Sequence, residues 1–273
     1  MERGVASHLV GLAVLSQAAE LLAPHGILLM PLKGIWLQRL VYPDPALRPI
    51  TDVDVLVPEA RYTETLARLR DAGWSLRGSN VSETSYRAPG LPLPLDVHRR
   101  LFGRAAFRLP TEGLFARSRP DAELFGAPVA LPDPLDVFAH LIGHFVKSRG
   151  FAPTPELTVR DLVLLAAAGL PPQPCAARLD AGGLGRAARY TLPLMAAEDG
   201  RGFGRAVLAA LRPDPIGDAI AHALSIAGAH RHAHSVWSAA LGFALEPSLP
   251  RALFSFGLRM WDRRADYSAH SDA

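Results

Sequence analysis

Two kinds of hydrophobic pattern alternate along the N-terminal part of the chain. Between Leu9 and Leu22 the apolar residues recur at helical spacing, whereas Ile27–Leu32 is a short apolar run that suits a buried strand. Residues 35–42 have helical character again, and three prolines then force a loop, at Pro43, Pro45 and Pro49. This part of the chain is therefore expected to run helix, strand, helix, loop.

The alternation continues with further strands. Asp52–Val57 is expected to form the second strand, followed by a helix from Pro58 to Gly73, because proline favours the first turn of a helix and glycine its end. More strand-like segments lie at 74–77, 82–88 and 95–98. Pro92 and Pro94 come just before the last of these, where proline suits a strand entry or a sheet edge.

From about Pro132 onward the pattern is helical. Glycine and proline breaks separate the predicted helices, which cover 134–147, 157–168, 175–184, 187–195, 204–211, 216–227, 236–243 and 252–264. The sequence thus predicts an α+β protein, with a small α/β domain at 1–115 and a mainly helical domain at 116–273. The boundary is expected between Phe102 and Pro132, and the tail at 268–273 is expected to fray.

The composition is that of a globular protein. The 273 residues are 49% hydrophobic and 20% charged, which argues against a disordered chain. The positive side chains are almost all arginine, because Lys33 and Lys147 are the only lysines, and the formal net charge is +3. A modest excess of arginine suits a protein that binds phosphorylated ligands.

Two features bear on cellular location. Polar residues interrupt the first apolar stretch at Ser16, Gln17 and Glu20, and no other run reaches about 18 apolar residues. We therefore expect an amphipathic helix, not a signal sequence or a membrane span, and no membrane partner. The single cysteine, Cys175, excludes an intrachain disulfide and a multi-cysteine zinc site, which fits a cytoplasmic protein.

The main candidate for chemistry is a pair of carboxylates in the second predicted strand. Asp52 and Asp54 lie two residues apart, so in a strand they face the same way. Two adjacent carboxylates repel each other, and burying them costs several kcal/mol unless a positive charge neutralises them. No lysine or arginine lies between them or just after them, so the pattern predicts a divalent cation such as Mg²⁺, which prefers oxygen ligands.

Two further segments extend this site. Lys33-Gly34 ends the first predicted strand, where glycine lets the backbone come close to a ligand and the next helix offers amide donors to phosphate oxygens. Asp96 lies in the apolar run Leu93–Val97, whose strand is expected to pair beside Asp52 and Asp54. Three carboxylates on neighbouring strands suit one or two magnesium ions.

The order of these motifs is similar to that of a known family. The segments that carry the resemblance are Leu32–Gly34, Tyr42–Pro45, Arg48–Val57 and Leu95–Arg99. Together they resemble the bacterial uncharacterised nucleotidyltransferase family, within the polymerase-β-like nucleotidyltransferase superfamily. The resemblance is strongest over residues 27–101 and continues weakly to a histidine and an aspartate, His144 and Asp161.

The resemblance implies a fold and a mechanism. The fold would be a polymerase-β-like core followed by a helical domain, with nucleotide and acceptor in the cleft between them. An acceptor hydroxyl would attack the α-phosphate of a nucleoside triphosphate such as ATP, and pyrophosphate would leave. By matching position, Asp52 and Asp54 would hold two magnesium ions, Asp96 would hold the one that activates the acceptor, and Gly34 would line the triphosphate.

Other roles and partners are expected around this core. Lys33 and Arg48 are the nearest cations for phosphate, an inference from their positions. The acceptor is expected to be a small molecule, a peptide or RNA, and no DNA partner is expected. The superfamily usually has Gly-Ser after the first strand, whereas Ile35 follows Gly34 here and offers no hydroxyl.

Several alternatives stay open. One hypothesis is a catalytically weak module that only binds nucleotide, and another is a toxin- or antitoxin-type transferase that acts on RNA or protein; an antibiotic-modifying role has similar weight. Independently of these hypotheses, Asp52 and Asp54 could flank a loop and cap the next element, and Asp96 could be an ordinary carboxylate on an edge strand. Lys33 could likewise be a surface lysine at a strand end, and Arg48 a solvated arginine in a loop.

The histidines also allow two interpretations. His98 shares a face with Asp96 and is a candidate for acceptor positioning or proton transfer, but a structural histidine fits as well. His140 and His144 are better explained as a packed pair than as a metal site, although His144 is a candidate for the cleft. We expect the late histidines to form a polar loop, at His222, His230, His232 and His234, and Arg160 with Asp161 to form a structural pair between helices.

Overall fold

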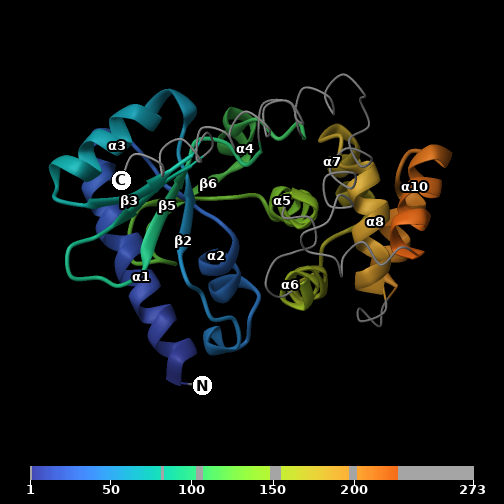
Figure 1. Cartoon of the computed structure of the whole chain (residues 1–273), viewed down its shortest axis with the longest axis horizontal. Coiled ribbons are helices and arrows are strands. Elements are labelled where there is room, and N and C mark those ends of the chain that lie inside the picture. The colour runs from blue at the N-terminus through green and yellow to red at the C-terminus, as the bar shows by residue number, and fades with distance from the viewer. Residues whose placement is uncertain (1, 81–82, 103–106, 148–154, 197–201, 227–273) are drawn as a thin grey trace, which may run out of the picture. The chain divides into compact units, whose positions relative to one another are not determined.

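The computed structural model describes residues 2–80, 83–102, 107–147, 155–196 and 202–226 (Figure 1). The helices expected at 236–243 and 252–264, the tail at 268–273, and His230, His232 and His234 lie outside the described residues. The described chain forms two compact units. The first comprises the residues up to Leu101 together with Leu109–Val137, and the second comprises Phe102–Arg108 and the residues from Phe138 onward.

The first unit is built on a five-stranded mixed sheet. Its strands are β1 (Met30–Pro31), β2 (Val53–Leu56), β3 (Ser75–Ser79), β4 (Glu83–Arg87) and β5 (Pro94–His98). Their order in the sheet is β1-β2-β5-β4-β3, so β1 and β3 are the edges. The β2–β5 pairing is parallel and the other three pairings are antiparallel. With the helices below, this confirms the predicted α+β class.

Helices and a hairpin complete this unit. The helices are α1 (Glu2–Leu22), α2 (Lys33–Leu40), α3 (Tyr62–Asp71) and α4 (Thr111–Arg117), and the hairpin joins β6 (Arg119–Asp121) to β7 (Val129–Leu131). Short 3₁₀ helices lie at Ala23–His25, Pro45–Leu47 and Glu59–Arg61. Neither α4 nor the hairpin was predicted, because each is too short to show a hydrophobic period.

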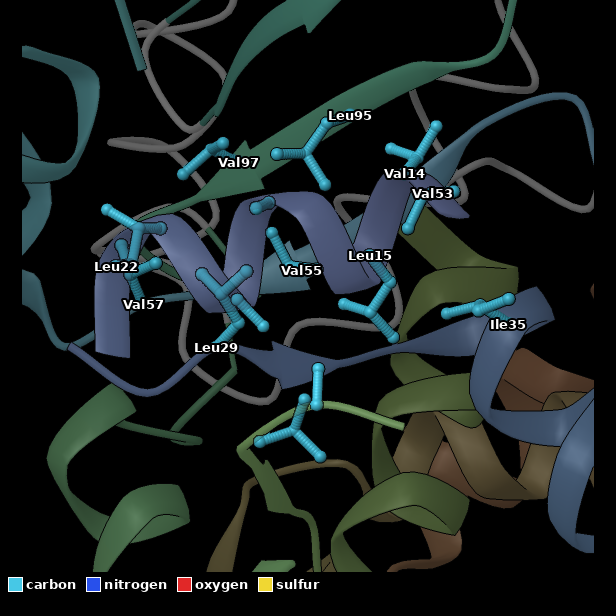
Figure 2. Packing of buried hydrophobic residues seen from close by; sticks show 14 of the residues in the cluster. Val14, Leu15, Leu22, Leu29, Ile35, Val53, Val55, Val57, Leu95 and Val97 are labelled. Carbon is cyan, nitrogen blue, oxygen red and sulfur yellow. The ribbon is translucent and has the colours of Figure 1, made fainter. Parts of the chain in front are cut away.

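The hydrophobic core lies between α1 and one face of the sheet. Figure 2 shows α1 packed along β2 and β5, with the labelled valine and leucine side chains between them. The fully buried side chains include Val14, Leu15 and Leu22 from α1, and Val53, Val55, Val57, Leu95 and Val97 from the sheet. Because side chains alternate along a strand, the residues between these valines and leucines point to the opposite face.

Helix α1 is unusually apolar. The stretch Gly4–His25 has the length and composition of a membrane-crossing helix, the only described one that does. In this fold its inner face is buried in the core of the first unit, and Gly4 and Gly11 bring it close to the loop before β2. A Cβ on Gly4 would lie 2.2 Å from the Ala46 carbonyl oxygen, so only glycine fits there. The cytoplasmic location expected from the sequence stays a prediction.

The second unit is helical where it is described. Its helices are α5 (Pro134–Lys147, whose first turn belongs to the first unit), α6 (Pro155–Ala167), α7 (Pro172–Ala181), α8 (Gly185–Ala196), α9 (Phe203–Ala210) and α10 (Pro215–Ile226). These are the six helices predicted between residues 134 and 227. Arginines of α8 bind the start of α10, with Arg186 Nε 2.8 Å from Asp214 and Arg189 Nε 2.6 Å from Asp218.

The first compact unit is made of two separate segments of the chain. Leu109–Val137 belongs to the first unit, which therefore extends beyond residue 115. An isolated β-bridge between Leu29 and Val129 explains this, because it joins the hairpin to the chain next to β1. Whether each unit folds as an independent domain stays a prediction.

Candidate functional site

The sheet face opposite α1 carries a row of polar side chains. Asp54 of β2 lies directly opposite Asp96 of β5, and Asp96 lies opposite Ser85 of β4. One step along, His98 of β5 lies opposite Glu83 of β4. Directly opposite residues project to the same side of a sheet, so these five side chains share one face. Since β5 lies between β2 and β4, Asp96 is not on an edge strand.

Asp54 is the centre of this polar face. It is 6% exposed, and its Oδ1 atom lies 2.8 Å from Lys33 Nζ and 2.7 Å from His98 Nε2. Burial alone would raise the pKa of Asp54, but the Lys33 ammonium and the His98 ring outweigh it and hold the pKa well below its usual range. Asp54 is therefore a stable carboxylate at neutral pH.

Lys33 supplies a counter-charge that the sequence argument did not find. No lysine or arginine lies between Asp52 and Asp54 or just after them, and Lys33 instead is the first residue of α2, beside β1 and β2. Burial lowers the pKa of Lys33, but the attraction and hydrogen bond of the Asp54 carboxylate outweigh burial, so the net shift is upward. Lys33 also has a φ of 46°, a left-handed conformation that a lysine rarely adopts.

His98 bridges two carboxylates. Its Nδ1 atom lies 3.0 Å from Glu83 Oε2, while Nε2 contacts Asp54, and the ring is nearly fully buried. Asn80 donates a 2.9 Å hydrogen bond to the other oxygen of Glu83. An imidazolium donates from both nitrogens, whereas a neutral ring donates from only one. The sequence did not identify Glu83, because only the β4–β5 register places it opposite His98.

The pKa values of Asp52 and Asp96 are shifted upward, in the opposite direction to that of Asp54. Burial, and then the charge of Asp54, raises the pKa of Asp52 to about 6, although Lys33 and Arg48 act against the shift. Burial also raises the pKa of Asp96, with a smaller contribution from the Asp54 carboxylate. The Oδ1 atom of Asp96 is buried and accepts no hydrogen bond from any residue that the structure describes. Such an orphaned acceptor has lone pairs available for a ligand.

The start of α2 lies close to the loop that carries Arg48. Leu32 is the N-cap of α2 and provides no side-chain cap. A Cβ on Gly34 would lie 2.5 Å from Ile50 Cγ2 and 3.5 Å from Arg48 Nη1, so glycine permits this close approach. Ile35 is 1% exposed and packs in the core, which explains why an apolar residue follows Gly34. The first amides of α2 and the Arg48 guanidinium therefore lie together.

A buried glutamine fixes this loop, and no pattern in the sequence predicted this role. Gln38 is 1% exposed; its Nε2 donates a 2.6 Å hydrogen bond to the Arg48 carbonyl oxygen, and its Oε1 lies 3.0 Å from His8 Nδ1. Asp44 caps the same loop by accepting a 2.8 Å hydrogen bond from the Ala46 amide. The position of Arg48 thus depends on contacts from both α1 and α2.

The chemistry of these three carboxylates suits a hard divalent cation. Asp52, Asp54 and Asp96 offer oxygen ligands, and Asp96 Oδ1 has no hydrogen-bond partner among the described residues. The raised pKa values of Asp52 and Asp96 come first from burial and then from the nearby Asp54 carboxylate. Within the described ranges, however, no three His, Cys, Asp or Glu side chains are already arranged to hold a metal ion. Oδ1 of Asp54 instead contacts Lys33 and His98.

The remaining candidates lie in the second unit. His140 and His144 are on α5 with their ring centroids 5.9 Å apart, and His140 also packs edge-on against Phe102. This arrangement agrees with a packed histidine pair. Asp161 is buried and Arg160 is exposed on α6, while His222 is exposed on α10. A role of His144 or Asp161 beside the carboxylates stays a prediction.

Comparison with known protein families found one match. The profile of a family described as uncharacterised nucleotidyltransferase matches residues 5–196, a span that includes all the site residues above. No curated protein matches the chain.

Solved structures give weaker similarities. An antigenic nucleotidyltransferase-like protein from Paracoccidioides brasiliensis is 16% identical with a TM-score of 0.46, over 74% of this chain and 94% of that one. The antibiotic-resistance factor ANT(2'')-Ia is 14% identical with a TM-score of 0.43, over 63% of this chain and 90% of that one. Similarities this low carry no argument about the site.

Proposed function

Because the chain belongs to the family described as uncharacterised nucleotidyltransferase, we propose that it moves a nucleoside monophosphate from a nucleoside triphosphate to an acceptor hydroxyl. The observation that supports this most is the pairing of Asp54 with Asp96 on adjacent parallel strands, with Asp52 just before the same strand. Asp54 and Asp96 share one face of the sheet, and Asp96 Oδ1 is buried there with no hydrogen-bond partner among the described residues.

The reaction requires few groups from the protein. The acceptor oxygen forms a bond to the α-phosphorus while the bond to the pyrophosphate oxygen breaks, and the hydroxyl proton leaves. Magnesium, when bound, would polarise the phosphate and lower the pKa of the attacking hydroxyl. Asp52 and Asp54 are proposed to hold the cation, and Asp96 to hold it on the acceptor side. The expected two-metal arrangement and the use of ATP belong to this proposal.

The triphosphate is proposed to bind at the start of α2. The amides of Gly34 and its neighbours point out of the helix N-terminus, where they can donate to phosphate oxygens. The Arg48 guanidinium lies beside them and would form charge-assisted hydrogen bonds with the same phosphate. Gln38 holds the Arg48 backbone and is a positioning residue for this contact.

The direct test measures pyrophosphate release and the labelling of acceptor pools by mass spectrometry, with each triphosphate in turn and with Mg²⁺ or a chelator. Asp54→Asn and Asp96→Asn should lower transfer more than about 100-fold, since changes outside the ligand shell alone cost about 10–100-fold. Asp71→Asn, exposed at the end of α3, is the matched control. Full transfer by folded Asp54→Asn, or transfer in the chelator, would refute the proposal.

A second candidate function is nucleotide binding without transfer. It is favoured by the bond from Lys33 to Asp54 and by the burial of Ile35, because the first occupies a proposed ligand and the second removes a hydroxyl donor. Triphosphate binding with no pyrophosphate release from any acceptor pool would support it. Transfer onto RNA or protein, as in a toxin or antitoxin, is the same proposed reaction with a different acceptor.

A further inference from the structure

One contact in the site conflicts with the metal role of Asp54. The Lys33 ammonium lies 2.8 Å from Asp54 Oδ1, and His98 Nε2 contacts the same atom. A divalent cation bound there would lie about 2.0–2.6 Å from this oxygen, so it would occupy the space of the ammonium. Lys33 and the cation cannot both neutralise Oδ1, because two positive charges that close repel each other.

The backbone conformation of Lys33 allows its side chain a second position, at the start of α2. Lys33 is the only described non-glycine residue with a positive φ, at 46°, and backbone conformations of this kind cluster at functional sites. It is the first residue of α2, directly before Gly34, and Arg48 Nη1 lies close to Gly34. A lysine side chain has four rotatable bonds and three donors, so its ammonium can turn from Asp54 toward a phosphate at the helix start.

We propose that Lys33 is an exchangeable counter-ion of Asp54, which a cation displaces when a triphosphate is present to accept the ammonium. This rests on the proposed function, because it assumes that Asp54 is a metal ligand. His98 stays on Asp54 in both states, since Glu83 also contacts its ring. The cation alone binds weakly because it must expel Lys33, and the triphosphate alone binds weakly because Lys33 is still held by Asp54. The two ligands therefore strengthen each other.

The experiment measures binding of Mn²⁺ and inorganic tripolyphosphate to the full chain by titration calorimetry, so that neither the nucleobase nor the acceptor matters. In wild type, tripolyphosphate should increase Mn²⁺ affinity at least about tenfold, which is within the usual range of such couplings. Lys33→Met should bind Mn²⁺ alone about tenfold more tightly than wild type, and its coupling to tripolyphosphate should shrink. Lys33→Arg keeps the charge and should behave like wild type.

Two controls keep the result specific. Arg39→Met removes a positive charge from the exposed side of the same helix, where Arg39 Nε donates to the Leu124 carbonyl oxygen at 2.9 Å, and it should leave Mn²⁺ affinity unchanged. Lys33→Gln is the substitute if Lys33→Met does not fold, as judged by circular dichroism. Mn²⁺ affinity should also rise in the glutamine variant, since it too lacks the ammonium.

The outcomes separate this inference from the proposed function. If wild type binds Mn²⁺ and releases pyrophosphate, but the folded Lys33 variants bind Mn²⁺ no more tightly than wild type, the counter-ion role is wrong and the function stands. If neither wild type nor the Lys33 variants bind Mn²⁺, with or without tripolyphosphate, both are wrong. An equal gain in Arg39→Met would show a general charge effect and also overturn the counter-ion role.

Discussion

The two faces of the sheet in the first unit differ sharply, although the same strands form both. Toward α1, β2 and β5 present Val53, Val55, Leu95 and Val97, all fully buried among other apolar side chains. Toward the other side the same strands present aspartate and histidine. A slip of one residue would exchange the two sets, so the register is strongly specified by the apolar face.

The apolar face of the sheet accounts for stability, and the polar face carries the candidate site. Apolar burial on the α1 face stabilises the fold, and nothing there offers chemistry. On the polar face, burial and then the Asp54 charge raise the pKa values of Asp52 and Asp96, so the ionised forms of these two side chains are unfavourable in the folded protein. A site arranged for a cation is expected to destabilise the empty protein, because its ligands repel one another until the cation binds. Removing an apolar side chain beneath α1 should therefore destabilise the fold, whereas neutralising Asp52 should stabilise it.

The largest effect is expected on the apolar face. Leu95→Ala removes a fully buried side chain beneath α1 and should lower the free energy of unfolding by about 2–5 kcal/mol, through lost burial and a residual cavity. Urea denaturation of the full chain measures this as a lower midpoint with an unchanged slope. Leu76→Ala on edge strand β3, where the side chain is 61% exposed, is the control and should cost far less. Equal losses in the two variants would contradict the assignment of the core.

A smaller effect of opposite sign is expected on the polar face. Folding raises the pKa of Asp52 to about 6, above its unfolded value, so the folded state binds the proton more tightly. The wild-type protein therefore loses stability as the pH rises from about 4 through 6. Asp52→Asn cannot ionise, so above pH 6 it should be more stable than wild type by about 1–2 kcal/mol, and near pH 4 the gain should vanish.

The measurement for Asp52 is urea denaturation at a series of pH values in the presence of a chelator. Asp71→Asn, at an exposed position, serves as the control and should show no such gain. A stability difference between Asp52→Asn and wild type that is constant with pH would mean that Asp52 is not the group that titrates.

The smallest effect on stability is expected at Gly34, in the first turn of α2. Gly34→Ala places a Cβ 2.5 Å from Ile50 Cγ2, so the Ile50 side chain or the loop that carries Arg48 must shift. Alanine favours a helix over glycine by about 1 kcal/mol, which offsets much of this strain, and we expect a net loss of about 1 kcal/mol or less. Tripolyphosphate binding should weaken more clearly, because Arg48 is displaced.

The matched background for this test is Ile50→Leu, which removes the Cγ2 methyl group from Cβ. Gly34→Ala in that background should recover most of the tripolyphosphate affinity, as measured by calorimetry. If the double variant binds no better than Gly34→Ala alone, the close approach at Gly34 serves the ligand directly and not the packing of the loop.

Hydrophobic spacing predicted the elements with long or strict periods. Alternation in Asp52–Val57 and 95–98 identified β2 and β5, and the same pattern brought Asp54 and Asp96 to one face. The six helices between residues 134 and 227 were predicted for the same reason, because each shows at least two turns of apolar period.

Local pattern could not predict contacts that depend on register or on tertiary closeness. Lys33 reaches Asp54 across 21 positions, and Glu83 meets His98 only because β4 is antiparallel to β5. Gln38 looks like an ordinary polar residue of a short helix, yet it is buried and fixes a loop. A counter-charge for Asp54 need not be near in sequence, because the fold provides the Lys33 ammonium from another element.

The bridge between Leu29 and Val129 has a consequence for the smallest soluble fragment. The Ala130 amide donates a 2.8 Å hydrogen bond to the Leu29 carbonyl oxygen, so the hairpin shields the backbone at the β1 edge of the sheet. A fragment cut at residue 115 would expose that backbone to strand addition by a second copy, and it should aggregate. A fragment that continues through Val137 retains its own cover, so crystallisation of the first unit is best begun from that longer piece.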